Sequence, residues 1–113
     1  MSGLVGTSHS KSKVIGRSLD TAKAWINFNG TGTPSIRSSF NVSTLSDYEA
    51  GQIGVNFKSP MKDSNYAVCV LGGHMYGGNA GCFDRNTSTF KAVTSSSSAY
   101  ADSSEVSAIV FGN

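Results

Sequence analysis

Charged side chains are scarce in this sequence of 113 residues, because lysine, arginine, aspartate and glutamate together make up 14%, against roughly 25% in a typical soluble domain. No apolar run approaches the ~20 residues of a membrane-spanning helix. The first residues also lack the apolar core behind a basic end that a secretory signal needs. We therefore expect one domain that is made in a cytosol and is not inserted into a membrane, with a surface wetted by hydroxyl and amide groups.

Signatures of catalysis and metal binding are also missing. The sequence contains no G-x-S-x-G elbow, no Walker loop, no H-E-x-x-H and no C-x-x-C. The seven acidic residues are scattered over predicted loops and strand ends, so only the fold could bring two of them together as glycosidase carboxylates, and the sequence gives such a pair no support. His9 and His74 are the only histidines, and no second ligand lies at a diagnostic spacing from His74. We expect a protein that is not an enzyme and that has no cofactor and no metal.

The segment from Thr21 to Val42 predicts a β-hairpin. Its first half alternates apolar and polar residues with the two-residue period of a strand that buries one face, and glycines follow where the chain must turn. A turn in the middle of the segment places Phe28 opposite Ile36. The same register places Ala24 opposite Phe40, so the apolar side chains of both strands share one face.

The other face of this hairpin carries the only tryptophan. The same register sets Trp25 beside Ser39 and Asn27 beside Arg37. A tryptophan on a face that is otherwise polar needs a cover, and the candidates are a second sheet, a neighbouring subunit or a ligand. The alternative is that Trp25 is capped by loops of its own chain or simply exposed, as isolated apolar surface residues often are.

Further strands are predicted where short alternating or apolar runs lie between turn residues, at 52–57, 66–71, 81–83, 87–93 and 105–111. The segment 43–51 between them is predicted to turn at Asp47 and Gly51. Residues 66–71 are nearly all apolar, which indicates a central strand covered on both faces. With no helical periodicity of useful length, the pattern predicts an all-β fold. We expect an antiparallel β-sandwich, jelly-roll-like, of about six to eight short strands, with a small barrel as the alternative.

The basic charge is concentrated at the start of the chain. Four basic residues against one acidic residue give the first 23 residues a charge of +3, and the formal charge of the whole chain is +2. Without aromatic interleaving or a nucleic-acid-binding fold, we expect no nucleic-acid partner. We interpret residues 1–20 as an extended N-terminal attachment arm and 21–113 as the sandwich domain. Within the arm, Val14 and Ile15 are the residues expected to pair with a neighbouring subunit, as part of an oligomer interface with Trp25.

A glycine-rich segment between two predicted strands is the candidate binding loop. It presents His74, Met75, Tyr76 and Asn79 on a backbone free to take unusual conformations. Sugar recognition commonly combines an aromatic face with amide hydrogen bonds, and loops on a rigid β-scaffold are where binding residues gather. Tyr100, in the serine-rich loop 94–104, is added to this receptor-binding set. The alternative is a long hairpin that packs on a sister subunit.

The two cysteines flank the same segment at equal distances from its midpoint. A hairpin centred there would set Cys69 opposite Cys82, which makes a cross-strand disulfide geometrically feasible. Assembly in a reducing cytosol argues against the bond. We therefore favour two free thiols and keep the disulfide as the alternative.

Four stretches carry a resemblance to a known family: AKAWINFNGTGT, IRSSFNVS, VNFKSPMKDSNYAV and the terminal VFGN. Together they resemble small β-rich domains in the tail fibres and related virion proteins of tailed bacteriophages. The resemblance covers the chain from Thr21 to about Leu71 and the last few residues.

This resemblance implies a structural or host-attachment module of the virion, made in the host cytoplasm and placed in the phage tail. It further implies a homotrimer whose partners are other tail or virion proteins and host-surface polysaccharide. The alternatives are a purely structural virion protein, such as a capsid decoration or tail adaptor without a receptor, and, more weakly, a carbohydrate-binding module of a bacterial enzyme.

Overall fold

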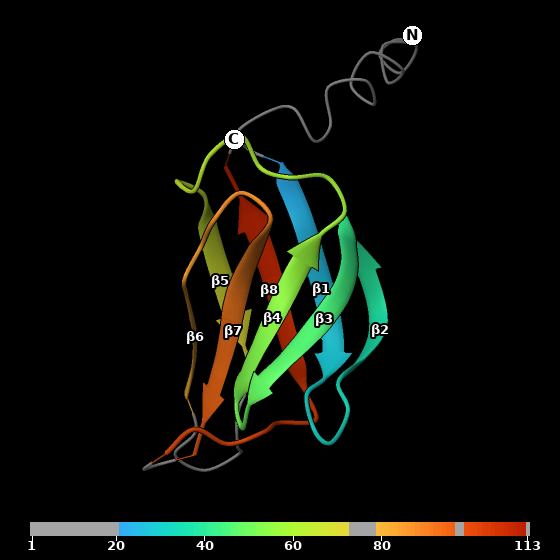
Figure 1. Cartoon of the computed structure of the whole chain (residues 1–113), viewed down its shortest axis with the longest axis vertical. Helices are drawn as coiled ribbons and strands as arrows, with labels where there is room; N and C mark the ends of the chain where they lie inside the picture. The colour runs from blue at the N-terminus through green and yellow to red at the C-terminus, as the bar shows by residue number, and fades with distance from the viewer. Residues whose placement is uncertain (1–20, 73–78, 97–98, 113) are drawn as a thin grey trace, which may run out of the picture.

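The computed structural model describes residues 21–72, 79–96 and 99–112. Its regular elements are β1 (Ala22–Asn29), β2 (Ser35–Phe40), β3 (Val42–Glu49), β4 (Gln52–Phe57), β5 (Ala67–Leu71), β6 (Asn79–Phe83), β7 (Thr89–Ser95) and β8 (Val106–Phe111). They form two antiparallel four-stranded sheets, ordered β2-β1-β8-β5 and β3-β4-β7-β6, which pack face to face (Figure 1). The predicted all-β antiparallel sandwich is therefore confirmed. The proposed arm 1–20, with Val14 and Ile15, lies outside the described residues.

The chain crosses from one sheet to the other four times, and a single residue makes the first crossing. Asn41 stands between β2 and β3 with a φ of 59°, a left-handed conformation that asparagine tolerates better than most residues. Its side-chain amide donates to the carbonyls of Lys23 (3.1 Å) and Ser59 (3.2 Å), and its side-chain oxygen accepts from the Ser59 amide (2.7 Å). Asn41 thus ties three segments together where the two sheets meet.

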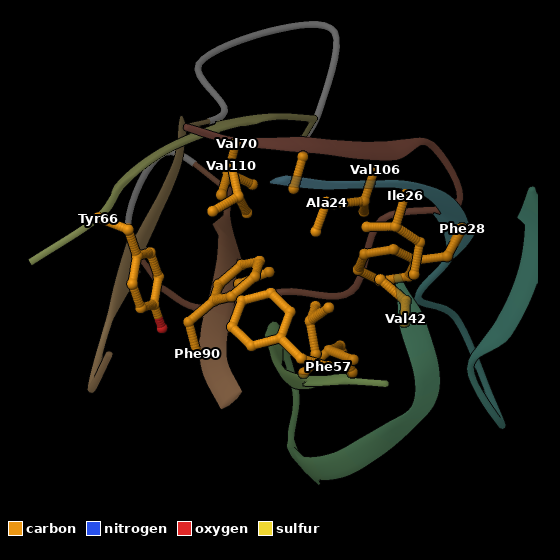
Figure 2. Packing of buried hydrophobic residues seen from close by; sticks show 14 of the residues in the cluster. Ala24, Ile26, Phe28, Val42, Phe57, Tyr66, Val70, Phe90, Val106 and Val110 are labelled. Carbon is orange, nitrogen blue, oxygen red and sulfur yellow. The ribbon is translucent and has the colours of Figure 1, made fainter. Parts of the chain in front are cut away.

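The core fills the space between the sheets with the inward side chains of every strand except β2, whose apolar residues are exposed. Phe28, Phe90, Val55 and Val110 are the largest side chains that are fully buried. Phe57 contacts Phe90 and meets the Tyr66 ring edge to face, with ring centroids 5.7 and 5.6 Å away (Figure 2). The apolar alternation along β1, β4 and β8 is that of strands that bury one face, and the apolar residues of that face are all buried: Ala24, Ile26, Phe28, Ile53, Val55, Phe57, Val106, Ala108 and Val110.

The hairpin of β1 and β2 is confirmed, but its register contains a bulge that the pattern did not predict. Phe28 pairs with Ile36 as expected, whereas Asn27 pairs with Ser38, and Arg37 is the extra residue. Ile36 is nevertheless exposed, because β2 is an edge strand whose residues are almost all exposed.

Beyond the bulge the pairing slips by one residue, which moves the side chains to the opposite face. Trp25 is therefore opposite Phe40 rather than Ser39. The prediction that Phe40 joins the buried face beside Ala24 is wrong, because Phe40 is 46% exposed.

Two other expectations are corrected by edge strands. Residues 43–51 do not form a turn region: they are mostly strand β3, and only Ala50 and Gly51 lie in the turn that follows, where Gly51 has a φ of 70°. The run 66–71 is not central either, because β5 ends its sheet and exposes Ala67, Cys69 and Leu71. Its apolar character on both faces therefore reflects an uncovered outer face.

The cysteines are not cross-strand neighbours. Although β5 and β6 follow one another in the chain, they belong to different sheets. Cys69 is opposite Ile109 and Cys82 is opposite Ala92. Both thiols are free, as favoured from the sequence, and the disulfide alternative is wrong.

Candidate functional site

The outer face of sheet β2-β1-β8-β5 carries a band of exposed apolar side chains. Trp25, 39% exposed, pairs with Phe40 on one side and with Ile109 on the other, and Ile109 pairs with Cys69. The band therefore crosses all four strands in register. We call the outward apolar set of this sheet the Trp25 face, and it consists of Trp25, Phe40, Cys69, Leu71, Ile109 and Phe111.

Charge is confined to the margins of the Trp25 face. The four strands contain only two charged residues, Lys23, which is buried, and Arg37 in the bulge. The Arg37 guanidinium donates to the Ser104 carbonyl at 2.6 Å, and it lies 3.3 Å from the Glu105 carboxylate. The centre of the face is therefore uncharged, and it suits an apolar protein surface better than a charged ligand.

The outer face of sheet β3-β4-β7-β6 has a different character, because a lysine lies between two aromatic rings. The Lys91 Nζ is 4.6 Å from the ring centroid of Tyr48 and 5.2 Å from that of Phe83. It also lies 3.4 Å from the Asp84 carboxylate. These four residues form what we call the Lys91 cluster, in which the ammonium is held by cation–π attraction and one ion pair.

A glycine in the neighbouring strand makes room for this arrangement. Gly54 on β4 pairs with Ser46 on one side and with Lys91 on the other. A Cβ atom at Gly54 would lie 2.6 Å from Cε2 of Tyr48, so the tyrosine ring occupies the space that a side chain would fill. Tyr48 can thus lean across β4 towards Lys91.

A hollow of about 450 Å³ adjoins the Lys91 cluster, and it is lined by Tyr48, Asp84, Arg85, Asn86, Thr89 and Lys91. The turn between β6 and β7 shapes its wall. The Asn86 side-chain oxygen accepts hydrogen bonds from the backbone amides of Ser88 (2.9 Å) and Thr89 (3.0 Å), an arrangement that fixes asparagine turns. Asp84 enters this turn with a φ of 53°.

A buried phenol supports the same turn from the inside. The Tyr66 hydroxyl donates to the Asn86 carbonyl at 2.7 Å, with the Thr89 carbonyl 3.1 Å away. Loss of hydration by burial raises the pKa of Tyr66 to about 12, and the positive charge of Arg85 offsets part of that effect. The core thus positions the residues that line the hollow.

The sequence-predicted site residues fall into three groups. His74, Met75 and Tyr76 lie outside the described residues. Asn79 and Tyr100 are exposed, and each pairs with Ser95, which lies between them. Trp25 lies on the outer face of sheet β2-β1-β8-β5, whereas Asn79 belongs to sheet β3-β4-β7-β6. The structure therefore separates Trp25 from Asn79 and Tyr100.

A second hollow, of about 250 Å³, lies along β6, and it is lined by Asn79, Ala80, Gly81, Cys82, Phe83, Val93 and Ser95. Of the two predicted receptor-binding residues that the structure describes, Asn79 and Tyr100, only Asn79 lines one of these two hollows. Phe83 borders this hollow and also belongs to the Lys91 cluster.

Sequence reasoning missed the Lys91 cluster. Tyr48 fell in a segment predicted to turn, so no partner on a neighbouring strand was sought for it. The usable signal was Gly54, because a lone glycine inside a strand pattern indicates the close approach of another group.

Within residues 21–72, 79–96 and 99–112, no three histidine, cysteine or acidic side chains gather as metal ligands. The same residues include no helix that could cross a membrane. Comparisons with family models, with curated proteins and with solved structures give no match for this chain. The fold therefore defines an antiparallel β-sandwich, and the resemblance to phage tail-fibre domains rests on the sequence motifs alone.

Proposed function

We propose that this chain is a structural domain of a phage tail fibre or fibre tip, that it assembles as a homotrimer, and that it helps the virion attach to the host surface. The sequence motifs support the phage assignment. The observation that carries the proposal is the Trp25 face, an uncovered apolar surface on a chain that is otherwise rich in polar groups.

The occupants that we propose for the Trp25 face are the Trp25 faces of two further copies of the chain, all three turned towards a common threefold axis. Three uncharged, pleated faces can meet at such an axis, because no like charges come together at their centres. With strands about 4.8 Å apart and about 3.4 Å per residue, four strands of six residues span roughly 20 by 20 Å. Such an area can form the apolar centre of an interface that buries about 800 Å² on each partner.

Self-association is tested by light scattering coupled to size-exclusion chromatography. We expect the wild-type particle to have about three times the 11.8 kDa mass of one chain. Trp25→Lys should give monomers, because it brings like charges together at the threefold axis. Tyr100→Lys, which changes an exposed aromatic residue outside the Trp25 face, should leave the trimer intact. A wild-type monomer at micromolar concentration would refute the proposed assembly.

Attachment is tested with labelled protein and host cells. We expect the protein to bind the cells, and replacing His74 and Tyr76 should weaken this binding. The second candidate, a capsid decoration or tail adaptor, predicts instead that the protein binds virions that lack it and ignores the cells. Electron microscopy of intact particles with labelled protein then locates the chain on the tail or on the capsid.

A further inference from the structure

On the face of the sandwich opposite the Trp25 face, we propose a binding site for a carboxylate-bearing sugar residue, in the hollow between Tyr48, Arg85 and Lys91. The inference rests on the proposed function for the source of the sugar, a host-surface polysaccharide. The site itself is argued from its shape, its aromatic surface and its charge.

The position of the hollow suits a ligand that is part of a long polymer. Its volume of about 450 Å³ falls within the ~300–1,000 Å³ typical of small-molecule sites. It lies on the outer face of sheet β3-β4-β7-β6, whereas the Trp25 face belongs to the other sheet. Assembly through the Trp25 face therefore leaves the hollow open to a polysaccharide.

Aromatic surface is available at the wall of the hollow. Tyr48 is 51% exposed even though Lys91 lies near its ring, and Phe83 is also exposed on the far side of the same lysine. The C–H face of a sugar ring is apolar and packs against an aromatic ring, while its hydroxyls remain free to form hydrogen bonds. The hydroxyl of Tyr48 can accept or donate such a bond.

The charge of the lining favours an acid over a neutral sugar. Among the described residues that line the hollow, Arg85 and Lys91 are cationic and Asp84 is the one anion. Lys91 is already paired with Asp84. The Arg85 guanidinium donates to the sulfur of Cys82 at 3.4 Å, and sulfur is a weak acceptor. The planar guanidinium therefore retains donors with the geometry that binds a carboxylate through two parallel hydrogen bonds.

Two further groups can bind hydroxyls beside the carboxylate. The Asn86 side-chain oxygen is used in the turn, but its NH₂ group makes no recorded hydrogen bond within the described residues and can donate to a ligand. The Asp84 carboxylate accepts from Lys91 and has further lone pairs for a sugar hydroxyl. The lining thus offers donors and acceptors around one cationic group.

The test is an NMR titration of the full chain in its solution oligomer with a panel of acidic trisaccharides: trigalacturonate, triglucuronate and α-2,8-linked trisialate. The neutral control is the methyl ester of trigalacturonate, which keeps the ring and the hydroxyls. We expect at least one acid to shift the amides of residues 84–91. Where that acid is trigalacturonate, its ester should bind about tenfold more weakly, because an ionic hydrogen bond is lost.

Two variants separate the site from general electrostatics. Arg85→Gln should weaken acid binding about tenfold or more, whereas Lys62→Gln, which removes an exposed charge that does not line the hollow, should not. Gly54→Ala retains every lining side chain but displaces Tyr48, and it should weaken binding severalfold. The inference is overturned if no acid in the panel shifts these amides at about 10 mM, or if Arg85→Gln binds as tightly as wild type.

Failure of this inference and failure of the proposed function give different results. If Arg85→Gln binds host cells as well as wild type, the attachment role stands and this site is not its receptor site. If the acids bind but the protein neither assembles nor attaches to cells, the site stands and the virion role falls.

Discussion

Raising the pH through the titration of Tyr66 tests the link between the core and the β6–β7 turn. The phenol is only 3% exposed, and its hydroxyl donates to the Asn86 carbonyl. Its pKa is about 12 in the folded protein and near 10 in an unfolded chain. The folded state therefore holds this proton more tightly than the unfolded state does.

The sign and size of the effect follow from this difference. The stabilisation is fully present below pH 10 and is lost as the pH rises towards 12, because the unfolded chain releases the proton first. Two pKa units correspond to about 2.7 kcal/mol in the free energy of unfolding. At pH 7, Tyr66→Phe should cost about 1 kcal/mol, the net value of one hydrogen bond. In that variant the Thr89 carbonyl still accepts a hydrogen bond from the backbone N–H of Asn86, so it is not left without a donor.

The assay is urea unfolding of wild type and Tyr66→Phe between pH 7 and pH 11.5. All other groups titrate alike in the two proteins, so the difference between their free energies of unfolding isolates Tyr66. We expect wild type to be more stable at pH 7 and the two curves to cross near pH 11, where the ~1 kcal/mol gain is cancelled. Tyr100→Phe, at an exposed tyrosine, should show no crossing. A difference that stays constant over this range would refute the reasoning.

Two further predictions concern packing and backbone conformation. Phe28→Ala should lower the free energy of unfolding by about 3–5 kcal/mol, because the ring is fully buried; a loss under about 1 kcal/mol in urea unfolding would contradict this packing. Gly51→Ala should cost more than about 2 kcal/mol, since its φ is 70° and the added Cβ would lie 2.3 Å from the Thr94 carbonyl oxygen. Gly32→Ala, at a φ of 58° with nothing within 4 Å, should cost only about 1 kcal/mol. Equal losses for the two glycines would show that the close approach to Thr94 is absent.

The inner faces of the sandwich could be predicted because they follow a local rule. Alternation of apolar and polar residues along β1, β4 and β8 places one set of side chains inside. This alternation can be read from residues that are adjacent in the sequence. The edge strands could not be predicted in the same way. β3 is largely polar, so it resembled a loop, and β5 is apolar on both faces, so it resembled a central strand.

The candidate sites also differ in whether a local sequence pattern could predict them. Trp25 could be recognised as needing a cover because it interrupts a polar face within one strand. The bulge at Arg37 brings Phe40 beside Trp25. Such a bulge is a local irregularity that the periodicity of the sequence does not encode. The Lys91 cluster joins Tyr48 and Phe83 through the order of four strands, and that order is set by tertiary packing.

The pairing of the first and last strands also constrains how the domain folds. β8 lies between β1 and β5, so both neighbours expose a hydrogen-bonding edge until β8 has been inserted. During synthesis on the ribosome, residues 106–111 emerge after all the strands with which they must pair. The sheet can therefore close only after translation has passed this point, and until then its open edges must be kept from pairing with other nascent chains.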